Sequence, residues 1–175
     1  MAYDNDKITG RLQQWLKGME KFTLPSWDQL PQLELYMDQV ILLLRQYLSP
    51  LHHEEDDKSI TTSIINNYVR MKIIPPPVKK KYSRVHLASL IMICILKQSL
   101  SISCIQRMLP QEMNEETLQP FYHDFVEQYG MVQNRFLQHT QKENEEKLLT
   151  SCAILSTLST ELTEFLLHEE TTKNK

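Results

Sequence analysis

The chain has 175 residues, of which 41% are hydrophobic and 23% are charged, and its formal net charge is −3 at pH 7. A chain of this length and composition can bury a core, which excludes a wholly disordered protein. Its three cysteines have no metal-ligand spacing, and its three glycines form no phosphate-binding loop. We therefore expect a globular protein without a disulfide framework, a zinc site or a cofactor.

The positive charge is concentrated in one internal segment. Residues 58–111 contain nine basic residues and neither Asp nor Glu. Residues 1–57 contain ten acidic and five basic residues and residues 112–175 contain twelve and five, so the three blocks carry −5, +9 and −7. Exclusion of carboxylates from buried segments is one explanation, but burial would exclude lysine as well. Because a phosphate backbone responds to the local field, we expect residues 58–111 to contact a polyanion.

The ends and the apolar stretches give no sign of export or membrane insertion. The N-terminal residues lack the basic and apolar regions of a secretory signal. The longest apolar stretch, Leu87–Leu100, is interrupted by polar residues and is too short to span a bilayer. We expect a cytoplasmic protein with no membrane partner.

Strand signals are scarce along the chain, so we predict a mainly α-helical fold. Apolar spacing predicts a helix over residues 8–21, an irregular proline-containing link, and a second helix over residues 35–48 that ends near Pro50. The polar run His52–Asp57 follows. Its histidines and carboxylates could hold a metal ion, but consecutive loop residues do not converge on one ion, so a solvated loop is favoured.

A short polar helix is predicted over residues 61–70. Thr61 or Thr62 can cap its N-terminus, and Ile64, Ile65 and Tyr68 have the spacing of an inward face. The outward face then carries side chains that can hydrogen-bond to phosphates, and Asn can also pair with an adenine edge in a major groove. These outward residues are Ser63, Asn66, Asn67 and Arg70. A merely solvated helix face is the alternative.

A basic hairpin is predicted directly after this helix. Pro75, Pro76 and Pro77 forbid helix and stiffen the chain, and the lysines at 79, 80 and 81 follow at once. A rigid hairpin with lysines at its tip is suited to lie along a DNA backbone or to reach a minor groove. The sequence therefore predicts a wing beside the polar helix.

The rest of the chain is predicted to be helical. Ser83 is expected to cap a long apolar helix, and Ser101 or Ser103 to start a short helix that Pro110 ends. Apolar residues then step by three and four over residues 118–136, where Gly130 suggests a bend or break, and again over residues 148–166. These last two stripes indicate either intrachain core or a dimer seam.

Several runs resemble the winged helix-turn-helix of the MerR family of transcriptional regulators. They are Asn66-Asn67-Tyr68-Val69-Arg70, Ile73-Ile74-Pro75-Pro76 and Lys80-Lys81-Tyr82-Ser83. Most of the chain also resembles an uncharacterised bacterial family of similar length that carries a MerR-like domain. That likeness rests on Leu24-Pro25-Ser26-Trp27 and Leu35-Tyr36-Met37-Asp38 as well.

The resemblance implies a domain organisation and a function. It implies an N-terminal extension over residues 1–34, a MerR-like winged helix-turn-helix over 35–110, and a C-terminal helical region over 111–175 for dimerisation or control. The implied function is a sequence-specific transcriptional regulator that binds double-stranded DNA as a homodimer, with no effector assigned. The implied DNA-binding residues are Thr62, Ser63, Asn66, Asn67, Arg70, Lys72, Lys79, Lys80, Lys81 and Arg84.

The sequence departs from the MerR pattern at two positions, and two other functions are alternatives to DNA binding. MerR proteins usually have Gly where Lys72 and Ser99 stand, so different backbone paths are expected at these two positions. The basic face could instead bind an acidic protein or the chain's own acidic C-terminal region. An enzyme is not expected, because no catalytic set stands out and His86 fits a surface or capping position better than a base.

Overall fold

The computed structural model describes residues 5–51, 60–141 and 145–172. Within these ranges, β-structure is limited to two isolated bridges. The helices are α1 (Asn5–Lys21), α2 (Met37–Leu48), α3 (Thr62–Arg70), α4 (Arg84–Leu96), α5 (Ile102–Met108), α6 (Glu115–Thr140) and α7 (Glu145–Thr172), with short 3-10 turns η1 (Trp27–Gln29) and η2 (Ser49–Leu51). The prediction of a mainly helical fold is confirmed.

The chain forms two compact units. Residues 24–128 make up one, which we call the central unit, and residues 1–23 together with 129–175 make up the other, which we call the terminal unit. Helix α6 contributes its first part to the central unit and its last part to the terminal unit.

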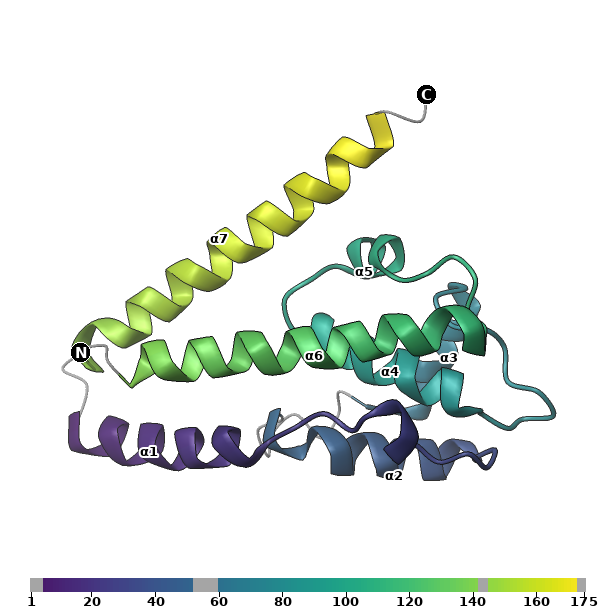
Figure 1. Cartoon of the computed structure of the whole chain (residues 1–175), viewed down its shortest axis with the longest axis horizontal. Helices are drawn as coiled ribbons and strands as arrows, with labels where there is room; N and C mark the ends of the chain where they lie inside the picture. The colour runs from purple at the N-terminus through teal and green to yellow at the C-terminus, as the bar shows by residue number, and fades with distance from the viewer. Residues whose placement is uncertain (1–4, 52–59, 142–144, 173–175) are drawn as a thin grey trace. The chain divides into compact units, whose positions relative to one another are not determined.

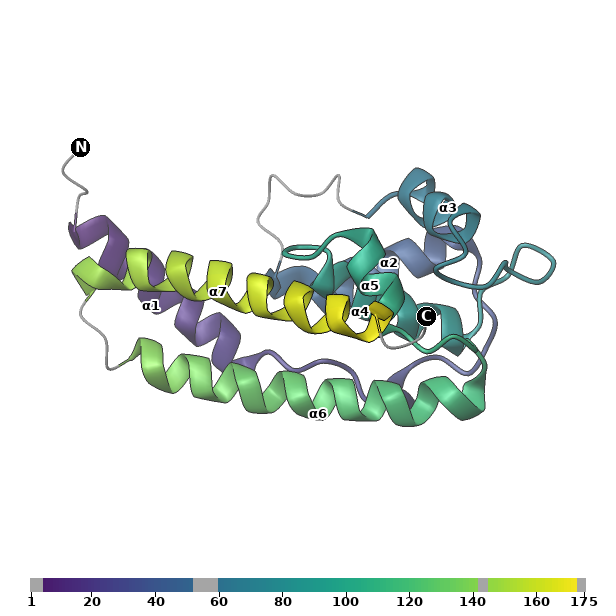
Figure 2. The same cartoon turned by 90° about the horizontal axis from the view of Figure 1, so that it is seen from above.

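Helix α4 is the core of the central unit. Its nine consecutive residues Val85–Ile93 are all buried, so this helix contacts protein on every side. A helix that is apolar all round must be buried in this way, which explains why the apolar run here is continuous rather than periodic. Figures 1 and 2 show α4 among α2, α3, α5 and the first part of α6.

The proline-containing link before α2 is part of this core. Leu24, Trp27 and Leu30 are buried. The Tyr122 hydroxyl on α6 donates to the Pro25 carbonyl at 2.9 Å, and its ring meets Trp27 edge-on with centroids 6.1 Å apart. Burial raises the pKa of Tyr122, so its hydroxyl stays protonated and remains a donor. The link therefore closes one side of the central unit.

Two boundaries differ from the sequence prediction. Helix α2 begins at Met37, and Leu35 lies outside it because its N–H and C=O both pair with Tyr82, each at 2.8 Å. Helix α6 continues unbroken through Gly130, since a single glycine inside a helix costs only about 1 kcal/mol. The run His52–Asp57 lies outside the described residues.

The terminal unit contains α1, α7 and the last part of α6. The rings of Phe22 and Tyr129 meet edge-on at 6.0 Å, as do those of Trp15 and Phe136 at 6.2 Å. The Gln133 side chain also donates to the Phe22 carbonyl at 3.0 Å, which holds the end of α1 against α6. None of the helices in the described ranges combines the length and the apolar character needed to cross a membrane.

Candidate nucleic-acid interface

Helix α3 is fixed in the central unit by its cap and its apolar face. Thr61 is the N-cap residue, and its Oγ1 accepts a hydrogen bond from the Ile64 N–H at 3.3 Å. Ile65 and Tyr68 are buried. Because residues three apart lie on one side of a helix, this burial turns the polar side of α3 to solvent. The predicted cap and inward face are confirmed.

The polar face of α3 carries five of the predicted site residues. Four of them, Thr62, Ser63, Asn66 and Arg70, are exposed. Asn67 is half-buried, and its Oδ1 accepts a hydrogen bond from Arg70 Nη2 at 2.6 Å. Asn67 therefore orients the Arg70 guanidinium, and its own carbonyl oxygen is already engaged.

Lys72 terminates α3 in a left-handed backbone conformation, with φ of 57°. Its N–H donates to the Val69 carbonyl and the Ile73 N–H donates to the Tyr68 carbonyl, each at 3.0 Å, which is the Schellman pattern. Glycine usually fills this position because it has no Cβ. Lys72 therefore takes the left-handed conformation that glycine favours, and its side chain is exposed.

The predicted hairpin is a two-residue turn, which we call the lysine hairpin (residues 78–81). Val78 and Lys81 exchange both backbone hydrogen bonds, at 2.9 and 3.1 Å. Lys79 and Lys80 between them have φ of 50° and 65°. Two positive φ values at the central positions define a type I′ turn, where Asn-Gly is the usual pair. Both lysines are exposed at the tip.

The base of the lysine hairpin is buried and anchored to α4. Ile73, Ile74 and Tyr82 are buried. His86 Nδ1 accepts a hydrogen bond from the Ser83 N–H at 3.0 Å, and the His86 ring meets Tyr82 edge-on at 5.3 Å. His86 thus caps α4 as expected, but it is buried rather than on the surface, because Tyr82 and the proline segment cover it.

Burial also determines the protonation state of His86. It lowers the pKa of the imidazole, and the carbonyl oxygens of Pro76 and Pro75 act in the opposite direction. Because Nδ1 accepts from Ser83, the proton of the neutral ring is on Nε2, which is buried and makes no hydrogen bond to the described residues. A neutral ring is required for this cap.

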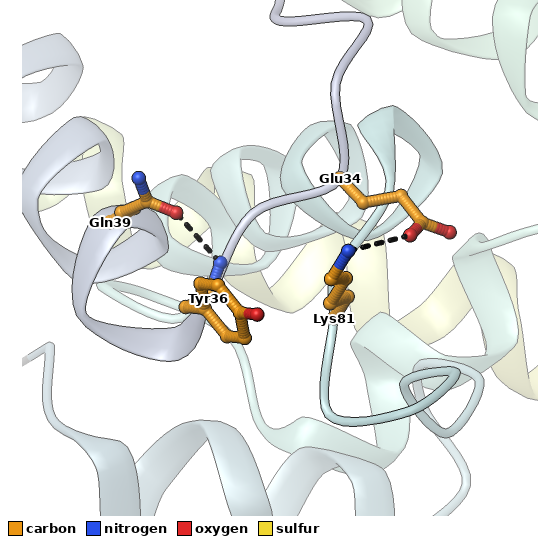
Figure 3. Close-up of polar contacts among 4 residues, drawn as sticks. All are labelled: Glu34, Tyr36, Gln39 and Lys81. Carbon is orange, nitrogen blue, oxygen red and sulfur yellow. Dashed lines mark hydrogen bonds and ion pairs between the residues drawn. The ribbon is translucent and has the colours of Figure 1, made fainter.

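Lys81 is in contact with a carboxylate. Its Nζ lies 3.7 Å from Glu34 Oε2 and 5.8 Å from the centroid of the Tyr36 ring. Gln39 Oε1 accepts from the Tyr36 N–H at 2.9 Å, which fixes the start of α2 beside the hairpin (Figure 3). Part of the charge of Lys81 is therefore neutralised, whereas Lys79 and Lys80 project beyond this contact.

Arg84 differs from the other predicted site residues. It is half-buried, and its guanidinium lies over the Trp27 ring, 5.5 Å from the centroid. Its Nε and Nη2 are shielded from solvent and make no hydrogen bond to the described residues. These two nitrogens cannot donate to a phosphate unless Arg84 moves away from Trp27.

Helix α3 and the lysine hairpin lie at the same end of the central unit. Figures 1 and 2 show the loop that follows α3 extending from that end, and α3 lies next to its base. Sequence reasoning missed three residues here, Trp27, Glu34 and Tyr36. No local pattern marks them, because Trp27 meets Arg84 only through tertiary packing, and Glu34 and Tyr36 meet Lys81 only through the Leu35–Tyr82 pairing.

The described residues include no group of three or more His, Cys, Asp or Glu side chains arranged to hold a metal ion. Burial raises the pKa of the Cys94 thiol to about 12, so it remains protonated and is a poor nucleophile.

A protein-family comparison covers most of the central unit. The model of the family described as Domain of unknown function (DUF1836) matches residues 25–125. The chain belongs to this family. The DUF1836 match includes the proline link, α3, the lysine hairpin and α4, and it confirms the likeness to a family of uncharacterised function. No curated protein and no solved structure matches the chain.

Proposed function

We propose that the central unit is a MerR-like winged helix-turn-helix that binds double-stranded DNA, and that the chain is a transcriptional regulator. In this proposal α3 is the recognition helix and the lysine hairpin is a short wing. The observation that carries the proposal is the exposed tip of the hairpin, where Lys79 and Lys80 both hold left-handed backbone conformations.

The backbone strain at this tip favours a functional role for its charges. A non-glycine residue with positive φ costs of order 1–3 kcal/mol, and such residues persist mainly at functional sites. Asn-Gly would close the same turn without this cost. Two exposed lysines on a buried base are suited to phosphate oxygens, which they contact as point charges.

The exposed face of α3 supports contact with a groove. Arg70 can bind guanine or phosphate through two nitrogens, and Asn66 can pair with adenine. Thr62 and Ser63 lie in the first turn of α3, where hydroxyls and backbone N–H groups suit a phosphate. In the proposal, α3 reads bases while the lysine hairpin and Lys72 contact the backbone.

The test is a fluorescence-anisotropy titration of the full chain with duplex DNA at several salt concentrations. The variant is Lys79→Asn/Lys80→Gly, which removes two charges and installs the preferred turn pair. We expect about tenfold weaker binding and a salt dependence smaller by about two phosphate contacts. Because the turn strain is relieved, the same variant should gain about 1 kcal/mol in stability toward urea.

The matched control is Lys17→Ala/Lys21→Ala, which removes two exposed charges from α1 in the terminal unit. It should bind DNA as the wild type does. Absence of binding by the wild type at low salt, or equal weakening by both variants, would refute the proposal. Since the hairpin variant is expected to be more stable, unfolding would not explain its loss of binding.

The ion pair between Lys81 and Glu34 favours one alternative, an acidic protein as the partner of the hairpin. The contact is an example of a carboxylate bound next to the exposed lysines. This alternative predicts binding to an acidic protein that survives DNase treatment, with no shift of duplex DNA.

A further inference from the structure

Two methionines of the described residues are exposed, and one of them lies at the end of α3. Met71 is the C-cap residue of α3 and is 43% exposed. The other, Met131 on α6, is 38% exposed. Oxidation of methionine yields a sulfoxide, which turns a flexible apolar side chain into a polar one. A solvent-borne oxidant can therefore reach a side chain at the end of the proposed recognition helix.

The Met71 sulfur ends a chain of side-chain hydrogen bonds along α3. Asn67 Nδ2 donates to Met71 Sδ at 3.4 Å, and Asn67 Oδ1 accepts from Arg70 Nη2 at 2.6 Å. Asn67 contacts both partners because residues three and four apart are neighbours on a helix. One amide group thus connects the sulfur to the guanidinium that pairs with guanine or phosphate in the proposed function.

We propose that Met71 is a redox-sensitive modification site, whose oxidation by a peroxide weakens DNA binding. A lone pair of the sulfur forms the S–O bond as the O–O bond breaks, and the proton of the transferred hydroxyl goes to the departing hydroxide, which leaves as water. The sulfur is oxidised to the sulfoxide and the peroxide is reduced. This proposal rests on the proposed function, because the quantity that changes is the affinity for DNA.

The change of hydrogen-bond acceptor is the physical basis of the effect. A thioether sulfur is a weak acceptor, whereas the sulfoxide oxygen is polar. Oxidation of Met71 therefore holds Asn67 Nδ2 more firmly, and the fixed amide keeps its Oδ1 on Arg70 Nη2. Bidentate pairing of arginine with guanine uses two guanidinium nitrogens. The nitrogen retained by Asn67 is withdrawn from that pairing.

The test is an anisotropy titration of the full chain with duplex DNA before and after treatment with hydrogen peroxide. Oxidised wild type is expected to bind at least about fivefold more weakly, which is the scale of a lost bidentate arginine contact. Met71→Leu has no sulfur at this position and should keep its affinity after treatment. The matched control, Met131→Leu, should lose affinity as the wild type does. Mass spectrometry of the peptides shows which methionines have gained oxygen.

Reduction separates oxidation of Met71 from oxidation of the cysteines. Dithiothreitol reverses disulfides and sulfenic acids but leaves the sulfoxide, which needs methionine sulfoxide reductases, one for each epimer. Dithiothreitol alone should leave binding weak, and addition of both reductases should restore it. Met71→Gln needs no oxidant, because its amide oxygen is a strong acceptor, and it should bind as weakly as the oxidised wild type.

Arg70→Ala tests the route from Met71 to DNA. It should bind more weakly than the wild type before treatment and lose no further affinity on oxidation of Met71. A further loss in this variant would overturn the proposal, as would an oxidised Met71→Leu that weakens like the wild type. Untreated wild type that does not bind DNA would refute the proposed function and this proposal with it. Wild type that binds equally well before and after oxidation of Met71 would refute this proposal alone.

Discussion

Three lysines of the central unit adopt backbone conformations that lysine rarely takes. Lys72, Lys79 and Lys80 all have φ between 50° and 65°. Lys72 closes the end of α3 and the other two form the tip of the lysine hairpin. The buried residues on either side, Ile73 and Tyr82, impose these turns, so the surrounding core supplies the stability that offsets the local strain.

His86 is the residue that couples the lysine hairpin to α4. It accepts the Ser83 N–H and stacks edge-on against Tyr82. A proton on Nδ1 would remove the acceptor and place a positive charge at the N-terminus of α4, where the helix dipole opposes it. The neutral form therefore belongs to the folded state.

We predict that acid weakens the fold through His86. Its pKa is lowered in the folded protein from 6.5, so below pH 6.5 the unfolded chain binds a proton that the folded chain excludes. The contribution of His86 to the free energy of unfolding should therefore be constant above pH 6.5 and fall as the pH drops from 6.5 to the folded pKa. Urea unfolding at pH 7.5 and 5.5 measures the difference.

His86→Gln should remove most of this loss, because glutamine keeps an acceptor for the Ser83 N–H and does not titrate. His123→Gln, on an exposed position of α6, is the matched control and should keep the wild-type profile. An unchanged acid loss in His86→Gln would show that another group is responsible.

At the scale of elements, the segment before α2 is hydrogen-bonded to the residue that follows the lysine hairpin. The two hydrogen bonds between Leu35 and Tyr82 align them, and this alignment brings Glu34 to Lys81. The Glu34 carboxylate forms an ion pair with Lys81, which would contact DNA in the proposed function. Glu34 is therefore expected to oppose DNA binding.

We predict that Glu34→Gln strengthens DNA binding about two- to fivefold. An exposed ion pair is worth roughly 0.2–1 kcal/mol, and its loss leaves Lys81 available for a phosphate. The salt dependence should grow by about one phosphate contact. Anisotropy titration at three or more salt concentrations measures both quantities.

Asp124→Asn removes the same charge from an exposed position of α6 and is the control for a general change of net charge. It should leave the affinity close to that of the wild type. Equal strengthening by both substitutions would mean that Glu34 acts only through the overall field.

At the scale of the whole molecule, the core of the central unit uses residues outside the winged helix-turn-helix predicted over residues 35–110. Trp27 and Leu30 precede that range, Leu118 and Tyr122 follow it, and all four are buried. The DUF1836 match has nearly the bounds of the central unit. The proline link and the start of α6 are therefore part of the folding unit.

We predict that residues 24–128 fold alone with a cooperative thermal transition, whereas residues 35–110 do not. The shorter fragment lacks Trp27, Leu30, Leu118 and Tyr122, and each large buried side chain is worth about 2–5 kcal/mol. Circular dichroism melts of the two fragments test this. A cooperative transition in residues 35–110 would contradict the assigned core.

Local patterns in the sequence were enough to predict most helices. The Thr61 cap, the inward face of α3 and the turn after three prolines depend on neighbouring residues only, so spacing and residue type reveal them. The start of α2 was misplaced, because Leu35 pairs with Tyr82, a residue far along the chain. The continuity of α6 through Gly130 likewise depends on more than local preference.

The sequence by itself determined that this is a mainly helical protein, with a carboxylate-free basic segment in which three lysines follow three prolines. Only the tertiary structure decided the pairing of Leu35 with Tyr82, the contact of Lys81 with Glu34 and the stacking of Arg84 on Trp27. The physical reason is that these features depend on contacts between distant segments, and distant contacts have no period in the sequence. Hydrophobic spacing and capping preferences act within a few residues and can be recognised without the fold.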